Sequence, residues 1–341
     1  MTFRKRMISC LLLSCMVATL AACGQKPSGA ASISSAAQSL AQSATDSEGR
    51  TFAIVYPIVH PFFEPIGEDA EEYAKTKGWT VITKAPDSSN AQQQIEIMEN
   101  LIAMNVDGIA IGPTDTSALV PTIDKAIDKG IQVICFESEA PDSKAEAFIG
   151  TDNYKAGRHM GEVIGKNLNG EGKIMILTGL PTQWSLNERI RGIQECLAEK
   201  YPKIQIVDTQ PSEGDPQKAV TCTENMIQAH ADFNAIVGID ATAGPAAISV
   251  WKAKGWQNDD AHMILTFDDM PDNLQGVRDG YVKALVAQRQ TTWGVEILDT
   301  LNALCDGQSV ETYNDTGSIE ITLDTLIHTS TSRPTLKNKI V

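Results

Sequence analysis

Three acidic residues and one arginine are the side chains of this sequence best placed to do chemistry. Glu137, Asp240 and Asp268 each end or follow a short apolar run, and Arg189 lies in a polar segment after another such run. Two carboxyl groups that flank one bond are the machinery of glycoside hydrolysis. The same residue types also line clefts that only bind a ligand, so the motifs around them must decide between catalysis and binding.

The sequence contains none of the common catalytic or phosphate-binding motifs. The segment "GEVIGKN" has three residues between its glycines instead of four and no Ser or Thr after Lys166, so it is not a phosphate loop. No G-x-S-x-G and no H-E-x-x-H occurs. The histidines are scattered singly, which does not favour a metal site: His60, His159, His230, His262 and His328. We therefore expect no metal, no cofactor and no catalysis.

The elements that must position these residues are short apolar runs that alternate with amphipathic segments. The runs, each typical of a buried strand, are 51–56, 79–83, 107–112, 131–136, 146–150, 173–179, 204–210, 235–240, 262–267 and 281–288. Helical patterns lie between them, and several close near a glycine: Gly78, Gly130, Gly170 and Gly255. Continuously apolar strands separated by helices predict parallel sheets covered on both faces. Ten strands are too many for one sheet, so we predict an α/β protein with two doubly wound lobes.

Polar and aromatic residues follow the predicted strands. Ligands of open parallel sheets bind beyond the carboxyl ends of the strands. The residues found there are Tyr56, His60, 112–115, 137–139, 151–153, 183–189, Asp240, Asp268, Asp269 and Gln288. The contrast between apolar strands and polar strand ends predicts a ligand cleft between the lobes.

The composition and the first residues indicate an exported, acidic protein. The chain has 341 residues and a formal net charge of −15, which argues against a nucleic-acid partner. Residues 1–22 read as a signal peptide, with a basic start and an apolar stretch too short to span a membrane comfortably. The sequence "LAACG" resembles the lipobox of bacterial lipoproteins, which implies a lipid on Cys23 and a membrane anchor; an ordinary signal peptide is the alternative. Residues 23–49 have the composition of a flexible linker.

The remaining cysteines do not form a disulfide framework by their spacing. They are Cys135, Cys196, Cys222 and Cys305, with no C-x-x-C pair. Such cysteines are more often buried thiols. A bridge between Cys196 and Cys222 stays open at this point.

An ordered set of short motifs occurs along residues 50 to 310: "HPFF", "GPTDTSAL", "FIGTDNYKAG", "NERIRG", "FDDMPD" and "VAQ". By this set the chain resembles the type I periplasmic binding proteins of the ribose-binding kind, the solute receptors of bacterial sugar importers. Repressors of the lactose-repressor kind share this core but begin with a DNA-binding headpiece, where this chain has an export signal. The resemblance implies a two-lobed receptor with a three-segment hinge, no enzymatic activity, and an ABC permease with its ATPase as partners.

The resemblance also implies where a ligand makes contact. The positions that match the family's motifs are Tyr56, His60, Phe62, Phe63, Gly112, Asp115, Glu137, Ser138, Asn153, Arg189, Asp240, Asp268 and Gln288. Trp184 is a further candidate for a cleft wall. Carboxylates accept hydrogen bonds from sugar hydroxyls, arginine donates to sugar oxygens, and aromatic faces cover C–H groups.

Each of these residues also has a purely structural interpretation. Asp240, Asp268 and Asn153 could cap helices, Arg189 could be an exposed helix charge, and Phe62 with Phe63 could staple the next helix. Glu137 could belong to a polar loop, and Trp184 could lie in the core. The two interpretations predict different places for these side chains in the fold.

The departures from a ribose-type site concern charge and aromatic cover. A ribose-type site would carry Asn at His60, Asp-Arg at Glu137–Ser138, Phe at Gly214 and Asn at Asp240. One arginine fewer and one carboxylate more make this cleft more acidic. We therefore expect another monosaccharide or a polyol, including one with an amino group, and not ribose itself.

These inferences combine into one organisation. Lobe one is predicted as 50–151 plus 289–317, lobe two as 152–288 plus 318–332, and 333–341 as a basic tail of unassigned role. The predicted function is a lipid-anchored extracytoplasmic receptor of an ABC importer that closes over a sugar or polyol. A sensory receptor for a chemoreceptor or histidine kinase is the first alternative, and a glycoside-processing enzyme is the second.

Overall fold

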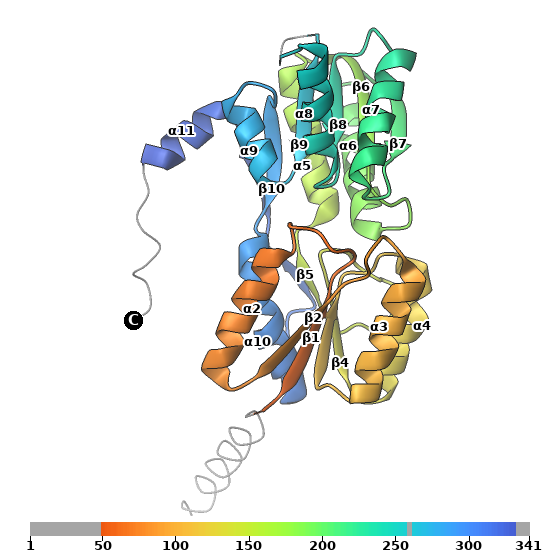
Figure 1. Cartoon of the computed structure of the whole chain (residues 1–341), viewed down its shortest axis with the longest axis vertical. Helices are drawn as coiled ribbons and strands as arrows, with labels where there is room; N and C mark the ends of the chain where they lie inside the picture. The colour runs from red at the N-terminus through yellow and green to blue at the C-terminus, as the bar shows by residue number, and fades with distance from the viewer. Residues whose placement is uncertain (1–48, 258–260, 332–341) are drawn as a thin grey trace, which may run out of the picture. The chain divides into compact units, whose positions relative to one another are not determined.

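The computed structural model describes residues 49–257 and 261–331. The predicted signal peptide, Cys23, the linker up to residue 48 and the tail 333–341 lie outside the described residues. All ten predicted strands are present (Figure 1). Two further short strands, β11 (Tyr313–Asp315) and β12 (Ser318–Ile321), escaped prediction because their sequences "YND" and "SIEI" lack an apolar run.

The first sheet has six parallel strands in the order β11-β5-β4-β3-β1-β2. Phe52 of β1 pairs with Val81 on one side and with Gly108 on the other. The strand bounds are β1 Thr51–Val55, β2 Thr80–Lys84, β3 Gly108–Ile111, β4 Gln132–Phe136 and β5 Phe148–Gly150. The sheet and its covering helices are lobe one.

Helices cover both faces of the first sheet, as Figure 1 shows. Phe52 and Ile54 pack with α2 (Glu64–Lys77) and α10 (Trp293–Cys305), after a short 3₁₀ turn η1 (Gln290–Thr292). The alternate residues Ala53 and Val55 pack with α3 (Ala91–Met104) and α4 (Thr116–Asp128). Successive strand residues point to opposite faces, so one apolar run contributes side chains to the cores on both sides of the sheet. Each large apolar side chain buried here contributes about 1.5–3 kcal/mol.

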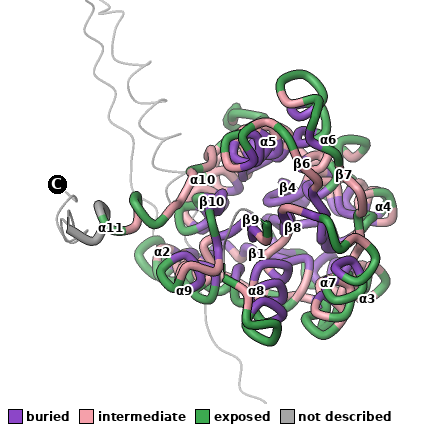
Figure 2. Tube along the Cα trace, turned by 90° about the horizontal axis from the view of Figure 1, so that it is seen from above, coloured by how far each residue is buried: buried purple, intermediate pink, exposed green. Residues whose placement is uncertain are grey.

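The second sheet, in lobe two, has the order β12-β10-β9-β8-β6-β7 and is parallel except for the antiparallel pair β10–β12. Its other strands are β6 Glu171–Thr178, β7 Lys203–Pro211, β8 Ala235–Gly238, β9 Met263–Phe267 and β10 Ala284–Gln288. Its helices are α5 Asn153–Asn167, α6 Trp184–Lys200, α7 Pro216–Ala229, α8 Ala243–Lys254, α9 Pro271–Arg278 and α11 Leu323–Thr331. The inner strands β8, β9 and β10 are buried, the edge strands β7 and β12 are largely half-buried or exposed, and the helices are exposed on their outward sides (Figure 2).

Two glycines bring α5 and α6 into backbone contact. A Cβ on Gly157 would lie 2.1 Å from the carbonyl oxygen of Arg189, and one on Gly192 would lie 2.2 Å from that of Tyr154. Any larger residue at either position would push the helices apart. The contact therefore fixes where Arg189 enters the interior of lobe two.

The chain passes between the two sheets three times: between β5 and α5, between β10 and α10, and between β11 and β12. These are the segments that a three-segment hinge requires, and they support the predicted fold class of two doubly wound lobes. The residue boundaries predicted for the lobes stay predictions.

The helix ends follow the glycine signals with a small shift. Gly78 and Gly255 are the left-handed C-caps of α2 and α8. At α4 and α5 the caps are Lys129 and Leu168, and the left-handed glycine follows one or two residues later.

Cys135, Cys196, Cys222 and Cys305 are all free thiols, so the bridge left open between Cys196 and Cys222 is not formed. Among the described residues, no helix combines the length and the apolar character needed to cross a membrane.

Candidate ligand-binding cleft

A cavity lies where the carboxyl ends of strands from both lobes meet. It offers about 70 Å³ to the centres of water-sized molecules, several times the ~10–15 Å³ that one water needs. Its lining residues are Pro57, Ile58, His60, Phe62, Phe63, Ser89, Glu137, Gly179, Leu180, Gln183, Leu186, Arg189, Gly214, Asp240, Ala241, Thr242, Asp268 and Gln288. Residues far apart in the sequence thus share one space.

Lobe one gives the cavity an aromatic wall. Phe62 and Phe63 lie in the loop between β1 and α2, with their rings edge to face at 5.0 Å and 86°. Phe63 stacks on Tyr56 at 5.2 Å, and Phe62 packs edge-on against Trp293 at 6.2 Å. Both phenylalanines line the cavity and also belong to the buried core of lobe one. The core contacts therefore hold the rings rigidly where they meet the cavity.

His60 is an uncharged member of this wall. Its Nδ1 accepts a hydrogen bond from the backbone N–H of Phe62 at 3.2 Å, which assigns the proton to Nε2. Burial lowers the pKa of His60, although Glu64 opposes this shift. The imidazole is therefore a neutral donor at neutral pH, and it adds no positive charge to the cavity.

Glu137 joins the lobes. Its carboxylate accepts a hydrogen bond from Gln183 Nε2 at 2.8 Å and one from Ser185 Oγ at 2.9 Å, both in lobe two. Its backbone has φ of 61°, a rare conformation for a residue with a side chain. Burial raises the pKa of Glu137, and the nearby guanidinium of Arg189 lowers it. Both carboxylate oxygens accept hydrogen bonds from lobe two, so Glu137 connects the two lobes and also lines the cavity.

Arg189 is a buried cation, and one nitrogen of its guanidinium has no hydrogen-bond partner among the described residues. Its Nε donates to Asn153 Oδ1 at 2.8 Å and its Nη1 to the carbonyl oxygen of Ile239 at 3.0 Å. The guanidinium lies 4.6 Å from the ring centre of Phe267. Its Nη2 has no hydrogen-bond partner in the described part of the chain and lies 4.0 Å from the carboxylate of Glu137. A buried guanidinium held in this way can donate to a ligand oxygen.

Asp268 and Gln288 form a second polar group from neighbouring strands β9 and β10. Gln288 Nε2 donates to Asp268 Oδ1 at 2.8 Å. Asn273 Nδ2 donates to the backbone oxygens of Phe267 and Asp268, which holds Asp268 at its φ of 67°. Asp268 is 2% exposed, and burial raises its pKa to about 6 although Arg189 opposes the rise.

Asp240 combines a structural role with a place in the cavity lining. Its Oδ1 accepts a hydrogen bond from the backbone N–H of Ala243 at 3.2 Å, at the start of α8. Burial and the negative charge of Asp268 raise the pKa of Asp240 to about 6. Asp240 can therefore stabilise the start of α8 and face a ligand at the same time.

The cavity brings together eight of the residues predicted from the sequence: His60, Phe62, Phe63, Glu137, Arg189, Asp240, Asp268 and Gln288. The interpretation of Arg189 as an exposed helix charge is wrong, because the residue is 1% exposed. Contact of these eight residues with a ligand stays a prediction.

Six other predicted residues do not line the cavity. Tyr56 is buried behind Phe63, and Gly112 binds Gln94 through its carbonyl oxygen. Asp115 caps α4 by accepting from Ala118 N at 2.9 Å. Ser138 accepts from Ser185 N, and Asn153 bridges Arg189 to the carbonyl oxygen of Glu137. Tyr56 and Asn153 therefore support cavity residues from behind, whereas Gly112, Asp115 and Ser138 bind residues outside the cavity lining.

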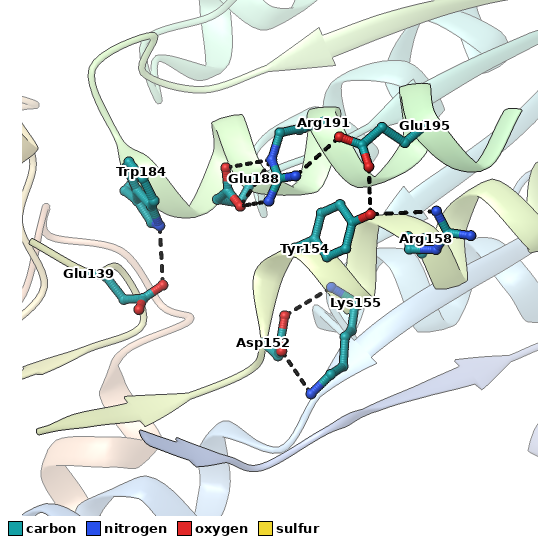
Figure 3. A network of polar contacts seen from close by, with 9 residues as sticks. All are labelled: Glu139, Asp152, Tyr154, Lys155, Arg158, Trp184, Glu188, Arg191 and Glu195. Carbon is teal, nitrogen blue, oxygen red and sulfur yellow. Dashed lines mark hydrogen bonds and ion pairs between the residues drawn. The ribbon is translucent and has the colours of Figure 1, made fainter. Parts of the chain in front are cut away.

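The sixth is Trp184, which belongs to a surface network drawn in Figure 3. Its Nε1 donates to Glu139 at 3.1 Å, again across the lobe boundary. In the same network, Arg191 stacks on Tyr154 at 4.1 Å. Trp184 therefore does not stand opposite the phenylalanines, and lobe two offers Leu180 and Leu186 to the cavity instead.

Sequence reasoning left several lining residues out of the predicted site. Gln183 lies in the segment 183–189 that follows β6, but it is not one of the positions matched to the family's motifs. Thr242 lies in the loop after β8, so the rule that identified Asp240 could also have selected it. Ser89 lies in the loop after β2, a strand that contributed no residue to the predicted site. Its Oγ donates to the carbonyl oxygen of Glu213 in lobe two at 2.9 Å.

The family pattern described as periplasmic binding protein domain matches residues 52–309. The chain belongs to that family. This periplasmic binding protein is 27% identical over 241 residues to the ribose import binding protein of Bacillus subtilis (strain 168), covering 71% of this chain and 76% of the relative. It is also 27% identical over 233 residues to the D-allose-binding periplasmic protein of Escherichia coli (strain K12), covering 66% of this chain and 74% of that protein.

Among solved structures, the periplasmic binding protein described here is similar to an ABC transporter solute-binding protein from Burkholderia graminis C4D1M, crystallised with D-arabinose. The two are 33% identical with a TM-score of 0.79, and the match covers 82% of this chain and 98% of that chain. The fold is that of the type I periplasmic binding proteins. Because these relatives are binding proteins, the chain is a binding protein and the glycosidase alternative falls away.

Proposed function

We propose that this periplasmic binding protein is the receptor of an ABC importer and holds a monosaccharide or a related polyol between its lobes. The observation that carries the proposal is the cavity between the lobes, with an aromatic wall on one side and an open guanidinium nitrogen and carboxyl groups on the other. Such a surface matches a sugar, which has C–H faces and a rim of hydroxyl groups. The relatives named for ribose, D-allose and D-arabinose support the same ligand class.

In this function Phe62 and Phe63 cover a C–H face of the ligand. Arg189 Nη2 donates to a ring or hydroxyl oxygen, and Asp268 and Asp240 accept from hydroxyl groups. Closing the lobes removes these polar groups from water, which strengthens each hydrogen bond. Glu137 with Gln183 and Ser185 stabilises the closed form, and a permease with its ATPase recognises that form.

The experiment is isothermal titration of the purified protein with pentoses, hexoses and polyols, together with mass spectrometry of any small molecule that copurifies. We expect a dissociation constant in the micromolar range or below, about −8 kcal/mol or more favourable. Absence of both heat and thermal shift over the whole panel would contradict the proposal.

We further propose that a lipid on Cys23 anchors the receptor to the membrane. The support is the sequence "LAACG", which lies outside the described residues. Cys23→Ala should move the protein from the membrane fraction to the soluble fraction in its own cell type. Wild-type-like fractionation of the variant would contradict the anchor.

A further inference from the structure

One end of the cavity offers hydrogen-bond acceptors without donors to match them. Asp268 Oδ1 is bound by Gln288, but no donor in the described part of the chain reaches Asp268 Oδ2. Gln288 Oε1 is buried and has no partner among the described residues, and Gln288 is 5% exposed. Asp240 faces the same cavity. A buried acceptor without a hydrogen bond costs free energy. This end of the cavity therefore favours a ligand that donates hydrogen bonds.

The charges of the cavity lining do not balance. Three carboxyl groups, those of Glu137, Asp240 and Asp268, face one guanidinium, that of Arg189. No lysine of the described residues lines the cavity, and His60 is neutral. Arg189 lies 4.0 Å from Glu137 and lowers the pKa of both Glu137 and Asp268, so one cation serves two carboxyl groups. The charge of Asp240 and Asp268 is left without a full partner, and Asp269 adds a further negative charge near Asp268.

The outer groove that continues from the cavity is also acidic. It shares Ile58, His60, Ser89, Gly214, Ala241 and Thr242 with the cavity and has a volume of about 790 Å³. Within residues 49–257 and 261–331, four acidic residues line it, Asp87, Glu213, Asp215 and Asp272, and no lysine or arginine does. Lys218 pairs with Glu213 from α7, which offsets one of these charges. A negative groove draws cations toward the cavity.

We propose that the ligand is an amino sugar or amino polyol whose protonated amine lies between Asp240 and Asp268. An ammonium group offers three donors and no acceptor, which matches the acceptors of Asp268, Gln288 and Asp240. Its positive charge balances the excess carboxylate. The rest of the ligand, with its hydroxyl groups, lies between Arg189 and the phenylalanines. This inference rests on the proposed function, because it names a subclass of the same ligands.

The test uses matched ligands that differ in one group. D-Glucose, D-glucosamine and N-acetyl-D-glucosamine form one set, the corresponding galactose compounds a second, and myo-inositol with an amino-inositol a third. At pH 7.5 we expect the amine of at least one set to bind tenfold or more tightly than its neutral and acetylated counterparts, by titration calorimetry. Charge-assisted hydrogen bonds are about twice as strong as neutral ones, which supports a difference of this size.

The outcomes separate the two claims. Neutral members that bind as tightly as the amines, or more tightly, would overturn the amine and leave the sugar receptor standing. No binding by any member, charged or neutral, would overturn both.

Charge-removing variants locate the amine. Asp268→Asn and Asp240→Asn keep the side-chain shape, and each should weaken amine binding tenfold or more and lower the ratio of amine affinity to neutral-ligand affinity. Asp142→Asn is the matched control, because Asp142 is exposed and outside the cavity lining. Thermal melting confirms folding of each variant. An amine preference that survives in both cavity variants would overturn the assignment.

Discussion

The two walls of the cavity are built differently. The wall from lobe one is mostly apolar, and its phenylalanines are anchored in the core of that lobe. The wall from lobe two carries Arg189, Asp240, Asp268 and Gln288, each held by a hydrogen bond to lobe two itself. Hydrogen-bonding groups with fixed directions discriminate between ligands, whereas aromatic faces can pack against many different ligands. The difference predicts that lobe two determines which ligand binds and that lobe one covers it.

The walls also differ in what fixes them. The loop of lobe one has Pro57 and Pro61 and is held by ring contacts. Arg189 depends on the contact between α5 and α6, which only the glycines permit. A change in lobe two should therefore reduce affinity through direction and charge, and a change in lobe one through apolar contact.

The largest effect is expected at Arg189. Arg189→Met leaves Glu137 buried without its cation and removes donors from Asn153 and Ile239, and breaking a buried pair costs about 3–5 kcal/mol. We expect ligand affinity to fall more than about a hundredfold and the melting temperature to fall as well. Arg189→Lys keeps the charge and loses the forked donor. The lysine variant should fold, but it should bind the ligand more than about tenfold more weakly than the wild type. Wild-type affinity in the lysine variant would show that lobe two does not select through this group.

Asp268→Ala is expected to lower affinity by more than about tenfold, or about 1.4 kcal/mol, without unfolding the protein. The variant removes the acceptor that Gln288 orients. Titration calorimetry measures the affinity, and circular dichroism confirms the fold. Unchanged affinity would remove Asp268 from the site.

The acidic wall should also be visible in stability measurements without ligand. Burial raises the pKa of Asp268 from 3.8 to about 6, so the folded protein holds a proton that the unfolded chain has released between these pH values. The wild type therefore loses stability as pH rises from about 4 to about 6. Asp268→Asn should be more stable than the wild type above pH 6, by up to about 3 kcal/mol, with the gain vanishing near pH 4. Urea unfolding at pH 4.0 and 7.5 measures this, and an equal difference at both values would contradict it.

On the opposite wall, Phe62→Leu should weaken binding only about three- to tenfold, because an aromatic contact contributes about 0.5–1.5 kcal/mol beyond its area. Leucine keeps most of the packing against Phe63 and Trp293. Titration with matched neutral ligands should show similar losses for all of them. A loss that differs sharply between those ligands would assign selectivity to lobe one as well.

The smallest effect is expected at Trp184. Trp184→Phe removes the hydrogen bond to Glu139, which lies outside the cavity lining. This half-buried hydrogen bond stabilises the protein by about 1 kcal/mol, and it does so in the free and the ligand-bound form alike. We therefore expect the ligand affinity to change less than about twofold. Fluorescence or calorimetric titration decides this. A tenfold loss would restore Trp184 to the site, as the sequence suggested.

The local pattern of the sequence determined the fold class and the edge of each sheet where a ligand could bind. All ten predicted runs form strands of the two sheets, and the polar residues that follow them lie at the carboxyl ends. The same pattern could not predict β11 and β12, which have no apolar run and form by pairing with β5 and β10. The local rule also ranked Asp115 and Asp240 alike, since each follows a strand and caps a helix.

Only the tertiary structure separated these two residues, because Asp240 lines the cavity and Asp115 does not. Likewise, it placed Trp184 against Glu139, used Glu137 to join the lobes, and enclosed Arg189 beneath the contact of α5 with α6. The physical reason is that a sequence fixes the direction of a side chain relative to its own strand or helix. Which groups from the other lobe it meets depends on how the two lobes pack against each other.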